Sequence, residues 1–225
     1  MPLDLARIQG VCFDLDGTLS DTDNEWTNRL QRRLHAVRFL FKHHDPYSFS
    51  RWVLLTAESP ANAVYRLLDV LSLDGKFANL YEKLIRQRRS RKQSFLLMDH
   101  AHELLEALSS RMPCTIVSAR DEMSAMRFVE QFSLGSFFRA VVTSQTCEHT
   151  KPFADPVIHA AKVMGVDPAS CVMIGDTTVD IVAGRAAGAQ TIGVLCGFGT
   201  ERELHKAGAD LIVKDLSGVM EVFGL

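Results

Sequence analysis

The stretch VCFDLDGTLSDTD, residues 11–23, joins an apolar, strand-like run to a cluster of acids. Carboxylates stand at positions 14, 16, 21 and 23. Asp14 and Asp16 are two residues apart, so their side chains point the same way if the strand continues. Two like charges on one face are costly unless a positive group joins them. The stretch therefore predicts either a cation site at a strand end or an ordinary polar turn.

Two purely structural motifs compete with a functional interpretation of this loop. An EF-hand calcium loop requires glycine at its sixth position, whereas Gly17 is the fourth residue here, and only Glu25 falls where the loop's last ligand belongs. A hairpin turn at Asp16-Gly17 requires a second strand, but residues 19–24 are polar and favour a helix start. A match to the four fixed positions of DxDGT arises by chance in roughly one chain of this length in a thousand. Alone, the motif suggests function without establishing it.

Short runs rich in Val and Ile recur along the chain. They lie at 11–15, 114–118, 140–144, 171–175, 190–194 and 210–213. They do not alternate with polar residues, as expected for strands buried on both faces of a parallel sheet. Helix-like segments separate them, at 98–111, 121–132, 153–165 and 178–189. The pattern predicts an α/β fold with a doubly wound, Rossmann-like parallel sheet.

Polar residues close several of these runs. Asp14, Ser118, Ser144 and Asp176 each stand at the end of an apolar run. Ligands of doubly wound sheets bind beyond the carboxyl ends of the strands. We therefore expect the functional site at that edge of the sheet.

Residues 21–97 have a different character. Apolar residues recur there at helical spacing, for example Trp26, Leu30, Leu34, Val37 and Phe41, and no strand is evident. The segment holds 14 Lys and Arg against 8 Asp and Glu, whereas the remainder of the chain holds 11 against 19. We predict an α/β core made of residues 1–20 and 98–225, with an all-helical, basic cap domain inserted at 21–97.

Composition limits the possible classes of function. The chain has 225 residues, of which 47% are apolar, and a formal net charge of -2, which gives no support for bulk nucleic-acid binding. We expect no membrane partner, because no apolar run reaches the length of a span and MPLDLARIQG lacks the plan of a signal peptide. The five cysteines form no C-x-x-C pair and are odd in number, so we expect reduced thiols in the cytoplasm, not disulfides or a zinc site.

Three further blocks carry chemistry, each beside a structural alternative. GDTTVD (175–180) follows a strand and opens a helix, where one acid is explained as a cap. Lys151-Pro152 offers a cation, although a lone lysine is usually a solvated surface charge, and Ser118 offers a hydroxyl that also suits a cap. Mg²⁺ takes carboxylate oxygens from separate strands, so Asp14, Asp16 and Asp176 are candidate metal residues.

In chain order, these blocks resemble the motifs of the haloacid dehalogenase-like hydrolase superfamily. FDLDGTL is similar to its first motif, Ser118 to its second, Lys151 to its third and GDTTVD to its fourth. Residues 173–213 are very similar to the phosphoglycolate phosphatase-like branch, and a helical insertion after the first motif resembles the cap of that branch, which is related to β-phosphoglucomutase-like proteins.

The resemblance implies a role for each acid. Asp14 is expected to attack phosphorus and form an aspartyl-phosphate. Asp16 is expected to protonate the leaving oxygen and then to act as base on water. Mg²⁺ is expected on Asp14, on the backbone carbonyl of Asp16 and on Asp176, with Asp180 orienting the site from behind the metal residues.

The resemblance also implies how the phosphoryl group is held. Its expected binding residues are Asp14, Leu15, Asp16, Ser118, Ala119 and Lys151, through side chains or backbone amides. Two blocks depart from the family pattern: SAR (118–120), where relatives commonly have Asn and then Lys or Ser, and KPFADP (151–156), where KPHPDP is typical. Arg120 is a candidate substrate contact or a solvated arginine. The basic run 86–92 either binds a polyanionic substrate or is the solvent-exposed face of a helix.

The function implied by the resemblance is that of a Mg²⁺-dependent phosphatase acting on a small phosphorylated metabolite, with phosphoglycolate as the nominal candidate. Dehalogenases and phosphonate hydrolases of this superfamily lack an acid at the position of Asp16, which favours phosphate esters. A phosphomutase of the β-phosphoglucomutase type and a non-catalytic phosphate-binding regulatory protein are the alternatives. The expected state is a cytoplasmic monomer or homodimer.

Overall fold

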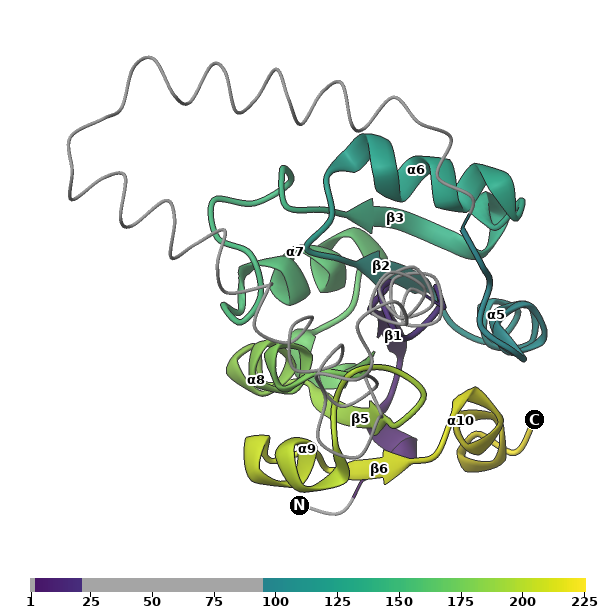
Figure 1. Ribbon diagram of the computed structural model, residues 1–225. Helices are drawn as coiled ribbons and strands as arrows, with labels where there is room; N and C mark the ends of the chain where they lie inside the picture. The colour runs from purple at the N-terminus through teal and green to yellow at the C-terminus, as the bar shows by residue number, and fades with distance from the viewer. Residues whose placement is uncertain (1–2, 22–94) are drawn as a thin grey trace, which may run out of the picture. The chain divides into compact units, whose positions relative to one another are not determined.

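A single parallel sheet organises the part of the chain that we describe, residues 3–21 and 95–225 of a computed structural model (Figure 1). Its six strands lie in the order β3-β2-β1-β4-β5-β6, and every neighbouring pair is parallel. They are β1 (Gly10–Phe13), β2 (Cys114–Val117), β3 (Phe138–Val142), β4 (Cys171–Gly175), β5 (Gln190–Val194) and β6 (Leu211–Val213). The predicted doubly wound α/β fold is confirmed, and β1 is central, where the strand order reverses.

Helices follow the strands. The structure has α5 (Ala101–Ser109), α6 (Glu122–Gln131), α7 (Asp155–Met164), α8 (Thr178–Ala186), α9 (Glu201–Ala207) and α10 (Leu216–Val222), with 3₁₀ turns η1 (Leu5–Arg7), η4 (Gly135–Phe137) and η5 (Pro168–Ser170). The four predicted helical segments are confirmed within shorter bounds. Helices α9 and α10 were not predicted from the sequence pattern. Thr200 and Glu203 form a capping box at the start of α9, and Gly208 ends that helix, so capping signals were present in the sequence.

The two faces of the sheet are both covered, as the absence of alternation in the strands predicted. Val11 and Phe13 of β1 belong to a core with α5, α6 and α10, whereas Cys12 belongs to a core with α7 and α8. Figure 1 shows α9 beside α8, and its Leu204 packs on Gly193 of β5. The four inner strands β1, β2, β4 and β5 are buried throughout, as expected for a sheet covered on both faces, whereas the edge strands β3 and β6 are mostly half-buried.

The inserted segment leaves and rejoins the core at one place. Ser20 and Leu97 form an antiparallel bridge, the Asp21 amide donates to the Leu96 carbonyl (2.9 Å), and the Met98 amide donates to the Leu19 carbonyl (2.9 Å). The predicted helical cap (21–97) and its basic run (86–92) otherwise lie outside the described residues, so the cap remains a prediction.

All five cysteines are free, and Cys12, Cys114 and Cys171 are buried in the core. Among the helices of the described residues, none is both apolar and long enough to span a bilayer.

Helix α8 lies close to the sheet because of a glycine. A Cβ on Gly184 would come within 2.7 Å of Thr191 Cγ2 and 2.8 Å of Met173 Cβ. A larger side chain at this position would therefore push the helix away from the sheet.

We therefore expect Gly184→Val to destabilise the protein by about 1–3 kcal/mol through overpacking. At roughly 2–4 °C per kcal/mol, the melting temperature should fall by about 2–12 °C. Val182→Ala on the same helix is the matched control, because Val182 is 41% exposed and should change little. Equal melting temperatures for Gly184→Val and the wild type, measured by calorimetry, would contradict this packing.

Candidate active site

The carboxyl ends of three adjacent strands bring the first group of predicted residues together. Asp14 follows β1, Ser118 follows β2 and Asp176 follows β4 directly, and β1 pairs with both β2 and β4. The Asp14 amide donates to the Ile174 carbonyl at 2.8 Å, which extends the ladder into the site. All three residues are buried, with at most 5% of each residue exposed. The structure therefore brings these three predicted residues together at the edge of the sheet where we expect the functional site.

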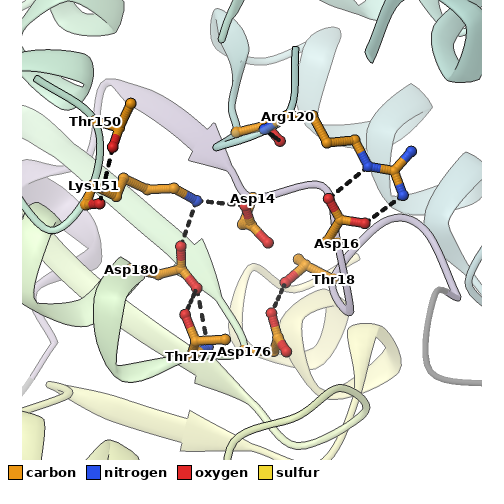
Figure 2. Close-up of polar contacts among 10 residues, drawn as sticks. Asp14, Asp16, Thr18, Arg120, Thr150, Lys151, Asp176, Thr177 and Asp180 are labelled. Carbon is orange, nitrogen blue, oxygen red and sulfur yellow. Dashed lines mark hydrogen bonds and ion pairs between the residues drawn. The ribbon is translucent and has the colours of Figure 1, made fainter. Parts of the chain in front are cut away.

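Lys151 reaches two acids of the site (Figure 2). Its ammonium nitrogen, Nζ, donates to Asp14 Oδ1 and, at 2.5 Å, to Asp180 Oδ1. The lysine side chain is only 4% exposed, so the alternative of a solvated surface lysine is wrong. Burial alone would lower the pKa of this amine, but the charges of Asp14 and Asp180 and their hydrogen bonds raise it above its usual value. Lys151 is therefore a fixed positive charge.

Asp14, Asp176 and Asp180 form a buried acidic cluster. One carboxylate oxygen from each lies within 4.8 Å of the others. Burial, followed by the charge of Asp180, raises the pKa of Asp14 to about 7 although Lys151 opposes the shift. Burial and then the charges of Asp14 and Asp180 hold the pKa of Asp176 well above its usual range. Lys151 supplies one positive charge to three acids, so the donor set fits a hard divalent cation.

Asp176 is held by two loops. Its Oδ2 accepts from the Phe198 amide at 2.7 Å, and its Oδ1 accepts from Thr18 Oγ1 at 3.2 Å. Gly17 has a φ of 82°, and a Cβ there would lie 2.4 Å from Asp176 Oδ2. A Cβ on Gly197 would lie 2.2 Å from the same oxygen. Glycines are therefore required on both sides of this carboxylate.

The loop after β5 was missing from the sequence-based site. Gly197, Phe198 and Gly199 all contact Asp176, and the sulfur of Cys196 lies 3.5 Å from the Gly17 carbonyl oxygen. The signal in the sequence was GFG (197–199), which begins three positions after the end of the predicted strand 190–194, since paired glycines often mark a close backbone approach.

Asp180 connects helix α8 to Lys151. Its Oδ2 accepts from the Thr177 amide (3.0 Å) and hydroxyl (2.6 Å), which completes a capping box at the start of α8, and its Oδ1 accepts from Lys151. The capping interpretation of GDTTVD is confirmed for Asp180, at the third helical position, while Asp176 points into the acidic cluster. Both oxygens of Asp180 are thus engaged by protein donors.

Asp16 is turned toward Arg120 (Figure 2). The guanidinium donates from Nε to Asp16 Oδ2 at 2.6 Å and from Nη2 to Asp16 Oδ1. The guanidinium carbon also lies 4.9 Å from the centre of the Phe95 ring, a cation–π contact. The Arg120 side chain is 16% exposed, so Arg120 is paired, not solvated.

The predicted phosphate-binding residues flank Asp14. Ser118 Oγ accepts from the Arg120 amide at 3.1 Å and so shapes the loop after β2. Leu15 and Ala119 directly follow Asp14 and Ser118, and the side chain of Leu15 is fully buried in the core. These residues therefore lie in the loops after the paired strands β1 and β2, at the same edge of the sheet.

Comparison with known proteins agrees with this arrangement. A family model described as haloacid dehalogenase-like hydrolase matches residues 11–194. Among curated proteins, the chain is similar to pyrophosphatase PpaX of Bacillus pumilus, at 28% identity over 97% of this chain and 98% of that protein. It is also similar to the phosphoglycolate phosphatase of Chromobacterium violaceum, at 28% identity over 98% of each chain.

Solved structures share the fold. A haloacid dehalogenase family hydrolase from Deinococcus radiodurans, with bound phosphate and sodium, matches with a TM-score of 0.73 and 22% identity over 97% of this chain and 96% of that one. A putative β-phosphoglucomutase from Thermotoga maritima matches with a TM-score of 0.70 and 19% identity over 97% and 100%. At these identities the likeness concerns the fold alone.

The raised pKa of Asp14 predicts how stability depends on pH when no divalent cation is bound. The pKa is about 7 in the folded protein and about 4 in an unfolded chain. Between these values the folded state keeps a proton that the unfolded state has lost, so stability should fall as pH rises through this window.

Asp14→Asn removes the titrating group and should flatten that slope. Thermal unfolding in EDTA between pH 4 and pH 7.5 measures it, with Asp99→Asn, at an exposed acid, as the control. Equal slopes for the wild type and Asp14→Asn would contradict the assignment of this proton to Asp14.

Proposed function

The chain belongs to the haloacid dehalogenase-like hydrolase family and is an enzyme of its phosphatase group, and we propose that it hydrolyses a small phosphorylated metabolite with Mg²⁺ through an aspartyl-phosphate on Asp14. One observation carries this proposal. The Asp14 carboxylate is buried at the centre of the sheet edge, bonded to Lys151 and close to Asp176.

Asp14 is suited to act as the nucleophile. In the first step a carboxylate oxygen of Asp14 attacks phosphorus, the bond from phosphorus to the ester oxygen breaks, and Asp16 donates a proton to the departing oxygen. Lys151 offsets the repulsion between the attacking carboxylate and an anionic phosphate. Asp180 holds Lys151 in place, because it accepts from the same ammonium group at 2.5 Å.

The second step regenerates the enzyme. Water attacks the phosphorus of the aspartyl-phosphate, Asp16 takes the proton of that water, and the bond between phosphorus and the Asp14 oxygen breaks. Inorganic phosphate leaves, and both carboxylates return to their starting states. Asp16 thus alternates between acid and base, which requires its carboxylate to reach the leaving oxygen and then the water.

The acidic cluster fits a magnesium ion. The carboxylates of Asp14 and Asp176 and the backbone carbonyl of Asp16 would hold it. Both oxygens of Asp180 are engaged by protein donors, so Asp180 would orient the neighbouring side chains and not bind the ion directly. When bound, Mg²⁺ neutralises charge on the carboxylates and on the phosphate. The Phe198 amide and the Thr18 hydroxyl fix the orientation of Asp176 for this task.

The transferring phosphoryl group would be bound between the loops after β1 and β2 and Lys151. Ser118 supplies a hydroxyl, and the backbone amides of Leu15, Asp16 and Ala119 supply further donors. Phosphoryl transfer depends mainly on such positioning and on charge neutralisation.

The similarity to proteins named as pyrophosphatase and phosphoglycolate phosphatase supports a small phosphorylated substrate. The free cysteines support a reducing compartment such as the cytoplasm. A monomer or homodimer remains our expectation for the assembly.

Asp14→Asn should abolish phosphate release, because the amide is a poor nucleophile. The expected loss is at least about 10⁴-fold in kcat, comparable to other losses of a group at the reacting centre. Phosphate release from a panel of phosphorylated metabolites with Mg²⁺ measures it, with Asp99→Asn as the control. A second measurement uses an ester with a radioactive phosphoryl group. Wild-type enzyme quenched in acid during turnover should carry this label, and Asp14→Asn should carry none. Turnover by Asp14→Asn at the wild-type rate would rule out this nucleophile.

Asp176→Asn should weaken Mg²⁺ binding. The asparagine keeps the carbonyl that accepts from Phe198 but removes the charge, so we expect the Mg²⁺ concentration at half-saturation to rise at least about 10- to 100-fold, the loss seen even for groups that only support a ligand. Two titrations measure it: phosphate release, and the rise in melting temperature with Mg²⁺. An unchanged response in both would remove Asp176 from the metal site.

A further inference from the structure

Arg120 and Asp16 form a bidentate ion pair, which we call the fork. This pair has a consequence for the proposed reaction. Each oxygen of Asp16 accepts an N–H from the guanidinium: Oδ2 from Nε at 2.6 Å and Oδ1 from Nη2. Paired forks of this kind fix the carboxylate in orientation as well as position. While the fork is intact, both oxygens of Asp16 accept from Arg120, so the proposed proton donation by Asp16 requires the fork to open.

Arg120 is anchored at its backbone. Its amide donates to Ser118 Oγ at 3.1 Å, and its carbonyl accepts from the Ser144 amide (3.0 Å) and the Ser144 hydroxyl (3.1 Å). The loop after β2 is therefore held in place at Arg120. Release of Asp16 needs only side-chain rotation, with the backbone of Arg120 unmoved.

The Phe95 ring supports the guanidinium from the place where the chain rejoins the core. Gln131 of α6 fixes Phe95 by accepting from its amide (3.3 Å) and donating to its carbonyl (2.9 Å), and the ring packs edge-on against Phe128. The Phe95 ring contacts the face of the guanidinium, whereas anions bind its edge. The guanidinium can therefore stay over the ring while its edge changes from one anion to another.

We propose that Arg120 exchanges Asp16 for an anionic group on the leaving part of the substrate, so that the enzyme selects phosphate esters whose leaving group itself carries a carboxylate or a phosphate. The inference rests on the proposed function, because Asp16 must be released in order to act as acid and base. Binding of the substrate anion supplies that release, and esters with an uncharged leaving group do not supply it.

The geometry favours this exchange. In-line attack by Asp14 places the leaving oxygen on the far side of phosphorus, the side that Asp16 has to reach and where its partner Arg120 lies. The side chains of Arg120 and Asp16 are 16% and 28% exposed. An anion that takes the place of Asp16 keeps the guanidinium paired, so the exchange leaves no uncompensated charge on the partly buried Arg120. Lys151, by contrast, is buried and keeps its two acids.

The test compares two esters that differ in the charge of the leaving group: phosphoglycolate, and 2-hydroxyethyl phosphate, in which an uncharged hydroxymethyl group replaces the carboxylate. For the wild type we expect kcat/KM to favour phosphoglycolate by about 10- to 100-fold, the value of one charge-assisted contact. In Arg120→Ala this preference should collapse to within about 3-fold, a difference too small for such a contact. Two changes should produce the collapse: kcat/KM falls for phosphoglycolate, and kcat rises for 2-hydroxyethyl phosphate because Asp16 is no longer held.

Variants separate this role from a structural one. Arg120→Lys keeps the charge but loses the fork, and should give an intermediate preference. Phe95→Leu keeps apolar bulk but removes the ring, and should reduce the preference for phosphoglycolate. Arg127→Ala, at an exposed arginine of α6, is the matched control and should keep the wild-type preference. If Arg120→Ala and Arg120→Lys lower kcat for both esters equally, or leave the preference unchanged, the exchange is wrong.

The outcomes also distinguish this inference from the proposed function. If wild-type enzyme with Mg²⁺ releases phosphate from p-nitrophenyl phosphate or from either ester but shows no preference for the anionic leaving group, the phosphatase assignment holds and the exchange fails. If it releases phosphate from none of the three, the proposed function fails and the exchange fails with it.

Discussion

The pairing of Lys151 with Asp14 and Asp180 is the interaction on which the site depends. The lysine ammonium is buried with two carboxylates, which is tolerable only because each charge has a charged partner. Removing one member would leave buried charge uncompensated, at a cost of about 3–5 kcal/mol. The same contacts orient the proposed nucleophile and attach it, through Asp180, to the start of α8. One lysine therefore links the loop after β1 to the helix after β4.

Surplus negative charge is the second constraint. Asp176 adds a third acid to the cluster, and its environment is built from backbone: the Phe198 amide donates to it, and Gly17 and Gly197 leave no room for a side chain beside it. A rigid cluster of oxygens with too few positive neighbours is the environment that a hard divalent cation stabilises. The polar loops after β1 and β5 are thus shaped around one carboxylate.

The two proposed catalytic acids are treated differently by the fold. Asp14 is buried and faces Lys151, whereas Asp16, two residues later, is partly exposed and faces Arg120. In the proposed reaction, Lys151 would serve the transferring phosphoryl group and Arg120 the leaving group. It also connects Asp16, through Arg120 and Phe95, to the point where the inserted segment rejoins the core.

The sequence by itself determined the α/β class, the strands, four of the helices and the acids at the strand ends, because these follow from local periodicity and from motifs within a few residues. It left Lys151 and Asp176 open to structural alternatives, and it missed the loop at 197–199, α9 and α10. Only the tertiary structure decided that Lys151 is buried between two acids and that Asp16 is paired with Arg120. Those contacts join residues 137 and 104 positions apart, and sheet order, which no local pattern contains, sets which distant loops meet.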